Sequence, residues 1–184
     1  VIEDQGFRFD TGPSFVLMRE FFDELFADCG ETLSDYLRLE VLEQSYQIYF
    51  ADGRVLNFYR DLDQTRAELE RFSPGSAAAF DRFLAEAGQY YRSLCPFLYQ
   101  CFSLKDLLRP RLWPLLPRLR PWQTFWQMAR RYFRDEALCY AVSFEAMFLG
   151  ASPFKAPGFY SLVTYADHMQ KIYHPIGGMY AIAQ

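Results

Sequence analysis

The sequence predicts an α+β fold, in which a small antiparallel or mixed sheet is covered by a larger helical layer. Up to about residue 60, apolar and polar residues alternate in several short stretches, which is typical of half-buried strands. From residue 61 onward, helical patterns dominate. Hydrophobic residues make up 51% and aromatic residues 19% of the 184 residues, so the chain can build a real core and is neither disordered nor fibrous.

The first region, residues 1–60, opens with a strand, a tight turn and a helix. In the stretch GFRFDTGPSF, two phenylalanines alternate with Arg8 and Asp10, and Thr11-Gly12-Pro13-Ser14 then ends the strand. Apolar spacing predicts a helix over 16–28. A glycine-containing turn of this kind is common where backbone approaches a ligand closely, and also where nothing binds.

Two further strands of this region flank a hairpin turn. Alternating stretches over 38–50 and 54–60 lie on either side of Asp52-Gly53, a dipeptide that strongly favours a tight hairpin. We expect these two strands to form the small antiparallel sheet together with the opening strand.

The second region, residues 61–150, is expected to be helical, and the third, residues 151–184, is expected to return to the sheet and to begin a further helix. Helix starts are predicted at Asp61 for a helix to about residue 72, at Ser73-Pro74 for a longer helix to about residue 99, and at Asp135 for a helix to about residue 149. A helix over 158–170 follows, and the last residues form a turn and the start of another helix that stops without a cap. We therefore expect an internal segment of a longer protein.

The charge distribution points to a partner for one surface. The net charge is −4, yet residues 104–134 hold eight cations against the single carboxylate of Asp106. A local basic belt on an acidic protein does not fit a general nucleic-acid binder. No apolar run approaches the roughly 20 residues of a membrane-spanning helix, so any contact with a bilayer would be peripheral. With only two histidines, no metal site is expected.

The segment 107–134 is the most unusual part of the basic belt. It combines four prolines, three tryptophans and many arginines, and from Trp122 onward its aromatic residues share one helical face. Tryptophan and leucine beside arginine suit a helix lying at the headgroup level of a membrane. A helical lid packed on its own core fits the same composition. The residues expected at a membrane are Trp113, Arg118, Trp122, Trp126 and Arg130.

Asp106 and Arg109 form the carboxylate–cation pair of greatest interest. On a helix, their spacing of three residues would place them on one face as a structural ion pair. The same pair could act in acid–base chemistry at the end of an apolar tunnel, where burial would shift its pKa values. No nucleophile elbow and no glycine loop for phosphates occurs in the sequence.

Six motifs, taken in order, resemble one known family. They are GFRFDTGPS, FADGRVLNFYRDLDQT, RFSPGSAAAFDRFL, FSLKDLLR, FLGASPFKAPGFYSLVTYAD and YHPIGGM. Their order and spacing resemble the bacterial phytoene desaturases of carotenoid biosynthesis, within the flavin-dependent amine oxidase-like superfamily, over essentially the whole chain. The resemblance implies a monotopic, membrane-associated flavoprotein on the cytoplasmic side of a membrane, with FAD as cofactor and a hydrophobic, phytoene-like polyene as substrate.

The resemblance also implies roles for particular residues. Asp10, Thr11, Gly12 and Pro13 match a turn beside the flavin ring, and Gly177 and Gly178 match a second close approach that leaves room for flavin and polyene. His174 stands where the family usually has another aromatic residue. Asp106 and Arg109 match a segment whose acidic and basic residues have been proposed as catalytic, so Asp106 is the expected proton acceptor while hydride passes to the flavin.

Other functions remain open at this stage. The main FAD-binding motifs of the family are absent from this sequence, so the segment alone is expected to bind FAD poorly and to be inactive. A carotenoid isomerase, a ketolase or a C30 desaturase of the same superfamily would fit similar motifs. A non-enzymatic, membrane-associated module would use the tryptophan- and arginine-rich segment only for anchoring.

Overall fold

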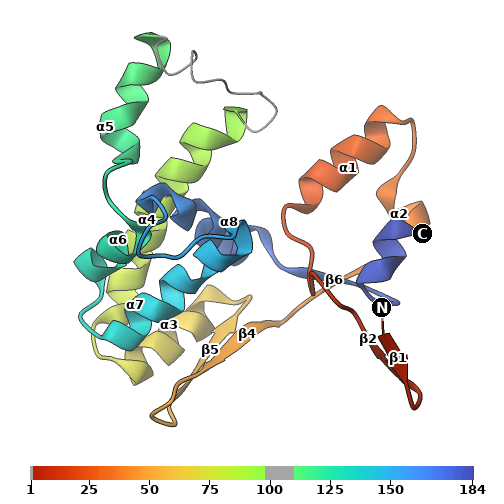
Figure 1. Cartoon of the computed structure of the whole chain (residues 1–184), viewed down its shortest axis with the longest axis horizontal. Coiled ribbons are helices and arrows are strands. Elements are labelled where there is room, and N and C mark those ends of the chain that lie inside the picture. Colours follow the sequence, from red (N-terminus) through yellow and green to blue (C-terminus); the bar gives the residue numbers. More distant parts are fainter. Residues whose placement is uncertain (1, 98–109) are drawn as a thin grey trace.

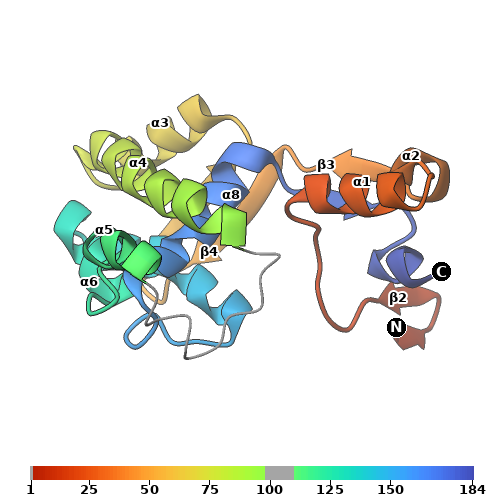
Figure 2. The same cartoon turned by 90° about the horizontal axis from the view of Figure 1, so that it is seen from above.

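The computed structural model describes residues 2–97 and 110–184, and their elements form two groups (Figures 1 and 2). The chain begins and ends in the smaller group, so the larger helical group is inserted between its two halves (Figure 1). The smaller group holds β1 (Ile2–Asp4), β2 (Phe7–Phe9), α1 (Arg19–Asp28), α2 (Leu33–Tyr36), β3 (Leu39–Val41), β6 (Tyr173–Pro175) and the 3₁₀ helix η6 (Met179–Ala183). The larger group holds β4 (Gln44–Tyr49), β5 (Val55–Tyr59), α3 (Leu62–Phe72), α4 (Ser76–Leu94), α5 (Leu116–Leu119), α6 (Phe125–Tyr132), α7 (Glu136–Ser143), α8 (Leu162–Gln170), and the 3₁₀ helices η1 (Cys95–Phe97), η3 (Pro110–Leu115), η4 (Phe144–Leu149) and η5 (Gly158–Ser161).

The α+β class is confirmed, but the predicted single sheet is wrong. The described residues form three separate two-stranded antiparallel sheets, which pair β1 with β2, β3 with β6, and β4 with β5. The opening strand turns back on the preceding residues through Gln5 and Gly6, which both have positive φ, as a tight hairpin requires. The predicted 38–50 strand is divided, because its first part pairs with β6 and its second part with β5.

The helix starts agree in part with their predicted caps. Asp61 and Asp135 cap α3 and α7, each accepting a hydrogen bond of 2.8 Å from a backbone N–H two residues later. The long helix α4 begins at Ser76 and not at Ser73-Pro74, because Gly75 adopts φ 82° directly before it. The first helix begins at Arg19, three residues later than predicted, because Val16 instead pairs with Tyr173 as an isolated β-bridge.

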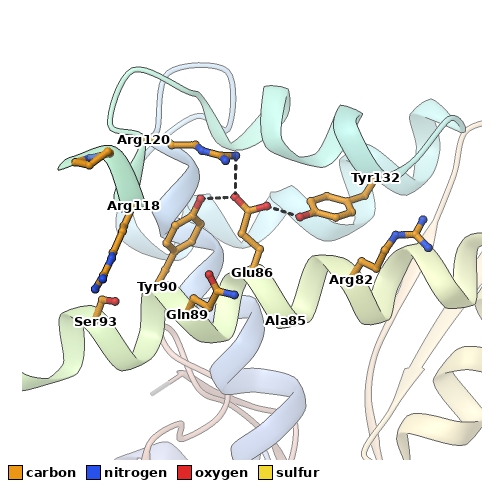
Figure 3. Close-up of a pocket in the computed structure, with 10 residues that line it drawn as sticks. Arg82, Ala85, Glu86, Gln89, Tyr90, Ser93, Arg118, Arg120 and Tyr132 are labelled. Carbon is orange, nitrogen blue, oxygen red and sulfur yellow. Dashed lines mark hydrogen bonds and ion pairs between the residues drawn. The ribbon is translucent and has the colours of Figure 1, made fainter. Parts of the chain in front are cut away.

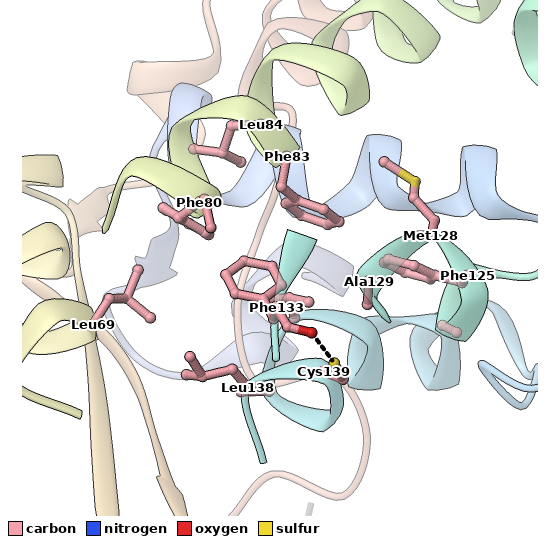
Figure 4. Packing of buried hydrophobic residues seen from close by; sticks show 14 of the residues in the cluster. Leu69, Phe80, Phe83, Leu84, Phe125, Met128, Ala129, Phe133, Leu138 and Cys139 are labelled. Atoms are coloured by element: carbon pink, nitrogen blue, oxygen red, sulfur yellow. Dashed lines mark hydrogen bonds between the residues drawn. The ribbon is translucent and has the colours of Figure 1, made fainter. Parts of the chain in front are cut away.

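The hydrophobic core lies in the larger group, where α4 crosses α6 and α7 (Figure 4). Phe83 is fully buried, and its ring stacks parallel to that of Phe125 with the centroids 6.3 Å apart. Burial of a phenylalanine side chain contributes about 2 to 3 kcal/mol. Helix α4 is therefore a fixed support, with one face in this core and another on the surface. Among the residues described, no helix is long and apolar enough to cross a bilayer.

Candidate functional site

The predicted cofactor-facing turn lies directly against the segment that holds Gly177 and Gly178. The carboxylate of Asp10 accepts a 2.7 Å hydrogen bond from the backbone N–H of Met179. Nδ1 of His174 donates to the carbonyl oxygen of Ser14 over 3.0 Å, which fixes the proton on that nitrogen. Together with the Val16–Tyr173 bridge, these bonds hold the two segments side by side although they are about 160 residues apart.

Asp10 and Gly178 fit together so closely that only glycine is accommodated. A Cβ atom at Gly178 would lie 2.6 Å from Oδ2 of Asp10, and the glycine has φ 87°. The other carboxylate oxygen of Asp10, Oδ1, is buried without a hydrogen-bond partner among the described residues. Gly12 differs, because a Cβ there would meet no atom within 4 Å. The turn thus has an open backbone face near an acceptor oxygen that a bound molecule could satisfy.

An apolar groove of about 470 Å³ begins at this turn. One wall is the chain from Gly12 to Met18, and the other walls are η4 and α8. The rings of Phe15 and Phe148 meet edge to face across it, with centroids 5.6 Å apart. Thr11, Gly177 and Gly178 are not among the lining residues, which are Gly12, Pro13, Ser14, Phe15, Leu17, Met18, Phe148, Leu149, Leu162, Val163 and Ala166. None of these carries an ionisable side chain, so the groove suits a hydrocarbon.

A buried acid pair lies behind two walls of the groove. Glu145 on η4 and Asp167 on α8 are 0% and 3% exposed, and Oε2 of Glu145 and both carboxylate oxygens of Asp167 are buried without a hydrogen-bond partner among the described residues. The hydroxyl of Tyr46 donates to Oε1 of Glu145 over 3.1 Å and lies 3.4 Å from Nε2 of His168. The neighbouring charge of Asp167 disfavours the ionised form of Glu145. We call Glu145 and Asp167 the acid pair; they belong to the two elements, η4 and α8, that also form walls of the groove.

Burial sets the protonation of this cluster. It raises the pKa of Glu145 well above its usual value, and the neighbouring Asp167 raises it further. Burial also raises the pKa of Asp167 to about 7, against a smaller opposing effect of Glu145. Burial lowers the pKa of His168 to about 4, so this ring is neutral at pH 7. The described residues contain no group of three or more potential metal ligands.

A basic recess of about 490 Å³ opens on the outer face of α4, beneath α5 (Figure 3). It is lined by Arg82, Ala85, Glu86, Gln89, Tyr90, Ser93, Pro117, Arg118, Arg120 and Tyr132. Glu86 lies at its centre and accepts hydrogen bonds from the hydroxyls of Tyr90 and Tyr132 and from the guanidinium groups of Arg120 and Arg131. Burial opposes ionisation of Glu86, but the hydrogen bonds from Tyr132, Tyr90 and Arg131 outweigh it and lower the pKa of the carboxyl.

The residues predicted to contact a membrane fall into two environments. Trp113 and Trp122 are 58% and 71% exposed, and Arg118 and Arg130 are also exposed. Trp126 is half-buried, with its ring 4.6 Å from that of Tyr140. The apolar face of α6 packs in the core through Phe125, Met128 and Ala129. For α6 itself, the structure therefore agrees with the packed-lid alternative.

Two predicted site residues lie outside the described part of the chain, and one group was missed. Asp106 and Arg109 fall within 98–109. The acid pair was not predicted, although Glu145 is the only charged residue in the apolar stretch 137–154. A single carboxylate among residues that are expected to be buried is expected to be buried as well. Because ionisable residues are almost never fully buried without partners, such a carboxylate predicts a second polar group beside it.

Comparisons with known proteins identify relatives over the whole chain. The zeta-carotene-forming phytoene desaturase of Myxococcus xanthus is 35% identical over 185 residues, and this match covers 100% of this chain and 36% of the relative. The phytoene desaturase of Cercospora nicotianae is 34% identical over 188 residues, and this match covers 100% of this chain and 30% of the relative. The 4,4'-diapolycopene oxygenase of a Methylomonas species is 30% identical over 193 residues, with 100% of this chain and 38% of the relative covered. No family model matches the chain. The chain spans about a third of the length of these curated relatives.

Proposed function

Because the chain belongs to the phytoene desaturase family, we propose that it is the part of an FAD-dependent carotenoid desaturase that holds the substrate beside the cofactor. The observation that carries this proposal is the apolar groove, one end of which is the turn at Gly12 and Pro13. A long hydrocarbon is recognised by apolar surface and exclusion of water, which this groove supplies. The same turn is joined through Asp10 to the segment of Gly177 and Gly178.

The residues of the turn fit a flavin. Gly12 leaves its backbone open on one side, so a flat ring could approach it closely, and Pro13 stiffens the turn. The unpartnered Oδ1 of Asp10 could accept a hydrogen bond from the cofactor. Bound FAD would supply the acceptor for the hydride that leaves the substrate. Most contacts to FAD would come from other parts of the protein, since the chain spans about a third of its relatives.

The described lining of the groove offers no proton acceptor. Formation of a C=C bond requires loss of a proton from the carbon next to the one that loses hydride. The described groove lining contains no ionisable side chain, and the acid pair lies behind the walls. We therefore retain Asp106 as the proposed acceptor and Arg109 as the group that keeps it ionised.

Membrane contact belongs to the same proposal. A polyene substrate dissolves in the bilayer, so the enzyme would take it up at the membrane surface, on the cytoplasmic side. Exposed Trp113, Leu116 and Trp122 lie in and directly after η3 and α5, a segment that stands away from the body of the larger group (Figure 1). Tryptophan side chains prefer the headgroup level, so this segment would lie in the interface without spanning the membrane.

Product analysis of the full-length protein tests the proposed function. Incubated with FAD and phytoene, it should form products with additional conjugated double bonds, seen as longer-wavelength absorption. The oxygenase among the relatives gives a specific alternative, and an oxygenated product would favour it over desaturation. An isomerised product of unchanged oxidation state, or no product with FAD bound, would also exclude the proposal.

A variant of the groove connects the activity to this site. Val163→Trp would fill the groove at α8, and we expect at least a tenfold loss of turnover with FAD occupancy unchanged. Val163→Ala is the matched control, because it changes the same position but leaves the groove open. Equal turnover of the tryptophan variant and the wild type would mean that the substrate does not occupy the groove.

A further inference from the structure

The basic recess holds more positive charge than its single carboxylate can balance. Arg120 and Arg131 pair with Glu86 at 3.5 and 3.0 Å, whereas Arg82 and Arg118 form no ion pair with any residue of the described segments. Figure 3 shows Arg82 and Arg118 on opposite sides of Glu86 along α4. Two guanidinium groups are therefore available to a ligand in a recess that already has a fixed floor.

The floor of the recess is Glu86 with the side chains that donate hydrogen bonds to it, and these bonds hold the floor in place. The hydroxyl of Tyr90 donates over 2.5 Å, Tyr132 donates from the opposite side, and Arg131 donates through two nitrogens at 3.2 and 3.0 Å. Charge-assisted hydrogen bonds of this kind are the stronger ones in proteins. Glu86 thus orders the floor while leaving a net positive recess above it.

The charge and shape of the recess fit a phosphate group. Guanidinium groups bind phosphate oxygens through a planar fork of N–H donors, and the side chains of Gln89 and Ser93 add neutral polar groups to the lining. The volume of about 490 Å³ can hold a phosphate with an attached glycerol unit. The chain as a whole has a net charge of −4, so a local cluster of arginines is needed to hold an anion on this face.

We propose that the basic recess binds an anionic phospholipid headgroup, with the guanidinium groups of Arg82 and Arg118 at its two ends. This inference rests on the proposed membrane contact, and it adds a specific headgroup site to it. Exposed Trp113 and Leu116 belong to η3 and α5, and α5 leads directly into the recess through Pro117 and Arg118. Tryptophan at the headgroup level and arginine on the phosphate would then fix the orientation of the enzyme at the bilayer.

Vesicle flotation of the full-length enzyme tests the headgroup site. Binding is measured to vesicles of phosphatidylcholine alone and to vesicles with added phosphatidylglycerol. An arginine near an anionic membrane contributes about a fivefold gain in binding, so Arg82→Gln with Arg118→Gln should weaken binding to the anionic vesicles roughly 30-fold. Binding to the neutral vesicles should not change.

A charge-matched control separates the recess from net charge. Arg8→Gln with Arg38→Gln removes the same charge from exposed positions in and next to the smaller group, and it should change binding less than about threefold. Equal losses in the two double variants, or wild-type binding of the recess variant to anionic vesicles, would overturn the headgroup site. The underlying membrane contact is tested separately with Trp113→Ala and Trp122→Ala on neutral vesicles. If these variants bind as the wild type does, the proposed contact surface fails, whatever the recess shows.

Discussion

Replacement of Glu145 by glutamine should make the protein less sensitive to rising pH. Glu145 and Asp167 are buried and burial raises the pKa of both carboxyls, so the folded protein retains protons that the unfolded chain releases. A glutamine at position 145 has the same shape. Its carbonyl can still accept from Tyr46, and its amide can donate permanently to the carboxylate of Asp167.

The direction of the pH effect follows from the raised pKa values. The stabilisation by a carboxyl whose pKa is raised in the folded state is present at low pH and is lost as the pH rises toward the folded pKa. For Asp167 this window runs from the ordinary value of 3.8 to about 7, and Glu145 titrates in the same direction. His168, whose pKa is lowered to about 4, acts in the opposite direction. It is present in both the variant and the wild type, so its contribution cancels in the stability difference between them.

The size of the change in the free energy of unfolding follows from the number of extra protons that the folded protein binds relative to the unfolded chain. One additional bound proton changes the free energy of unfolding by about 1.4 kcal/mol per pH unit. The Glu145→Gln variant loses that proton. Between about pH 5 and about pH 7, its stability relative to wild type should therefore rise by about 3 kcal/mol.

Urea unfolding at several pH values measures this difference. Glu40→Gln, at an exposed position of β3, is the matched control and should follow the wild-type pH dependence. A stability difference between Glu145→Gln and wild type that stays constant from pH 5 to pH 7 would refute the retention of a proton by Glu145 in the folded state. A variant that loses stability relative to wild type as pH rises would refute it more strongly.

Three further predictions concern Glu86 at the floor of the recess and the contact of Asp10 with the segment of Gly178 at the turn. Glu86→Gln should lower the free energy of unfolding by about 2 to 3 kcal/mol in urea titrations, because four donors lose their charged acceptor; an unchanged midpoint would contradict this. Gly178→Ala should cost about 1 to 3 kcal/mol, and more than Gly53→Ala, since both glycines have positive φ but only Gly178 would place its Cβ against Asp10. Asp10→Asn should reduce FAD retention by the full-length protein on gel filtration without lowering its melting temperature by more than a few degrees; retention equal to wild type would exclude the unpartnered oxygen as a cofactor contact.

Local chemical signals account for the parts of the fold that the sequence predicts well. Asp52-Gly53 specifies its hairpin because the turn needs a positive φ, which Gly53 supplies at 84°. Asp61 and Asp135 cap their helices through bonds to residues only two positions away. Each of these features depends on a few neighbouring residues, so it can be recognised without knowledge of the tertiary structure.

Features that depend on distant partners could not be predicted in the same way. Strand β3 alternates like β4, but its partner β6 lies more than 130 residues later in the chain. The position of Ser73-Pro74 fits a helix start equally well, yet the glycine that follows determines where α4 begins. The acid pair likewise needs the contact between η4 and α8, which only the folded chain supplies.

The resemblance to a known family, and not local pattern, brought the turn and the two glycines together as one site. The geometry explains why the site at the groove needs both the turn and the segment that holds the two glycines. The groove lies between the turn of the smaller group and two elements of the larger group, η4 and α8. The described contacts that hold the turn to the returning chain are few: the bond from Met179 to Asp10, the bond from His174 to Ser14, and one β-bridge. The main hydrophobic cluster lies within the larger group, so we expect these contacts to contribute to the width of the groove near Gly12.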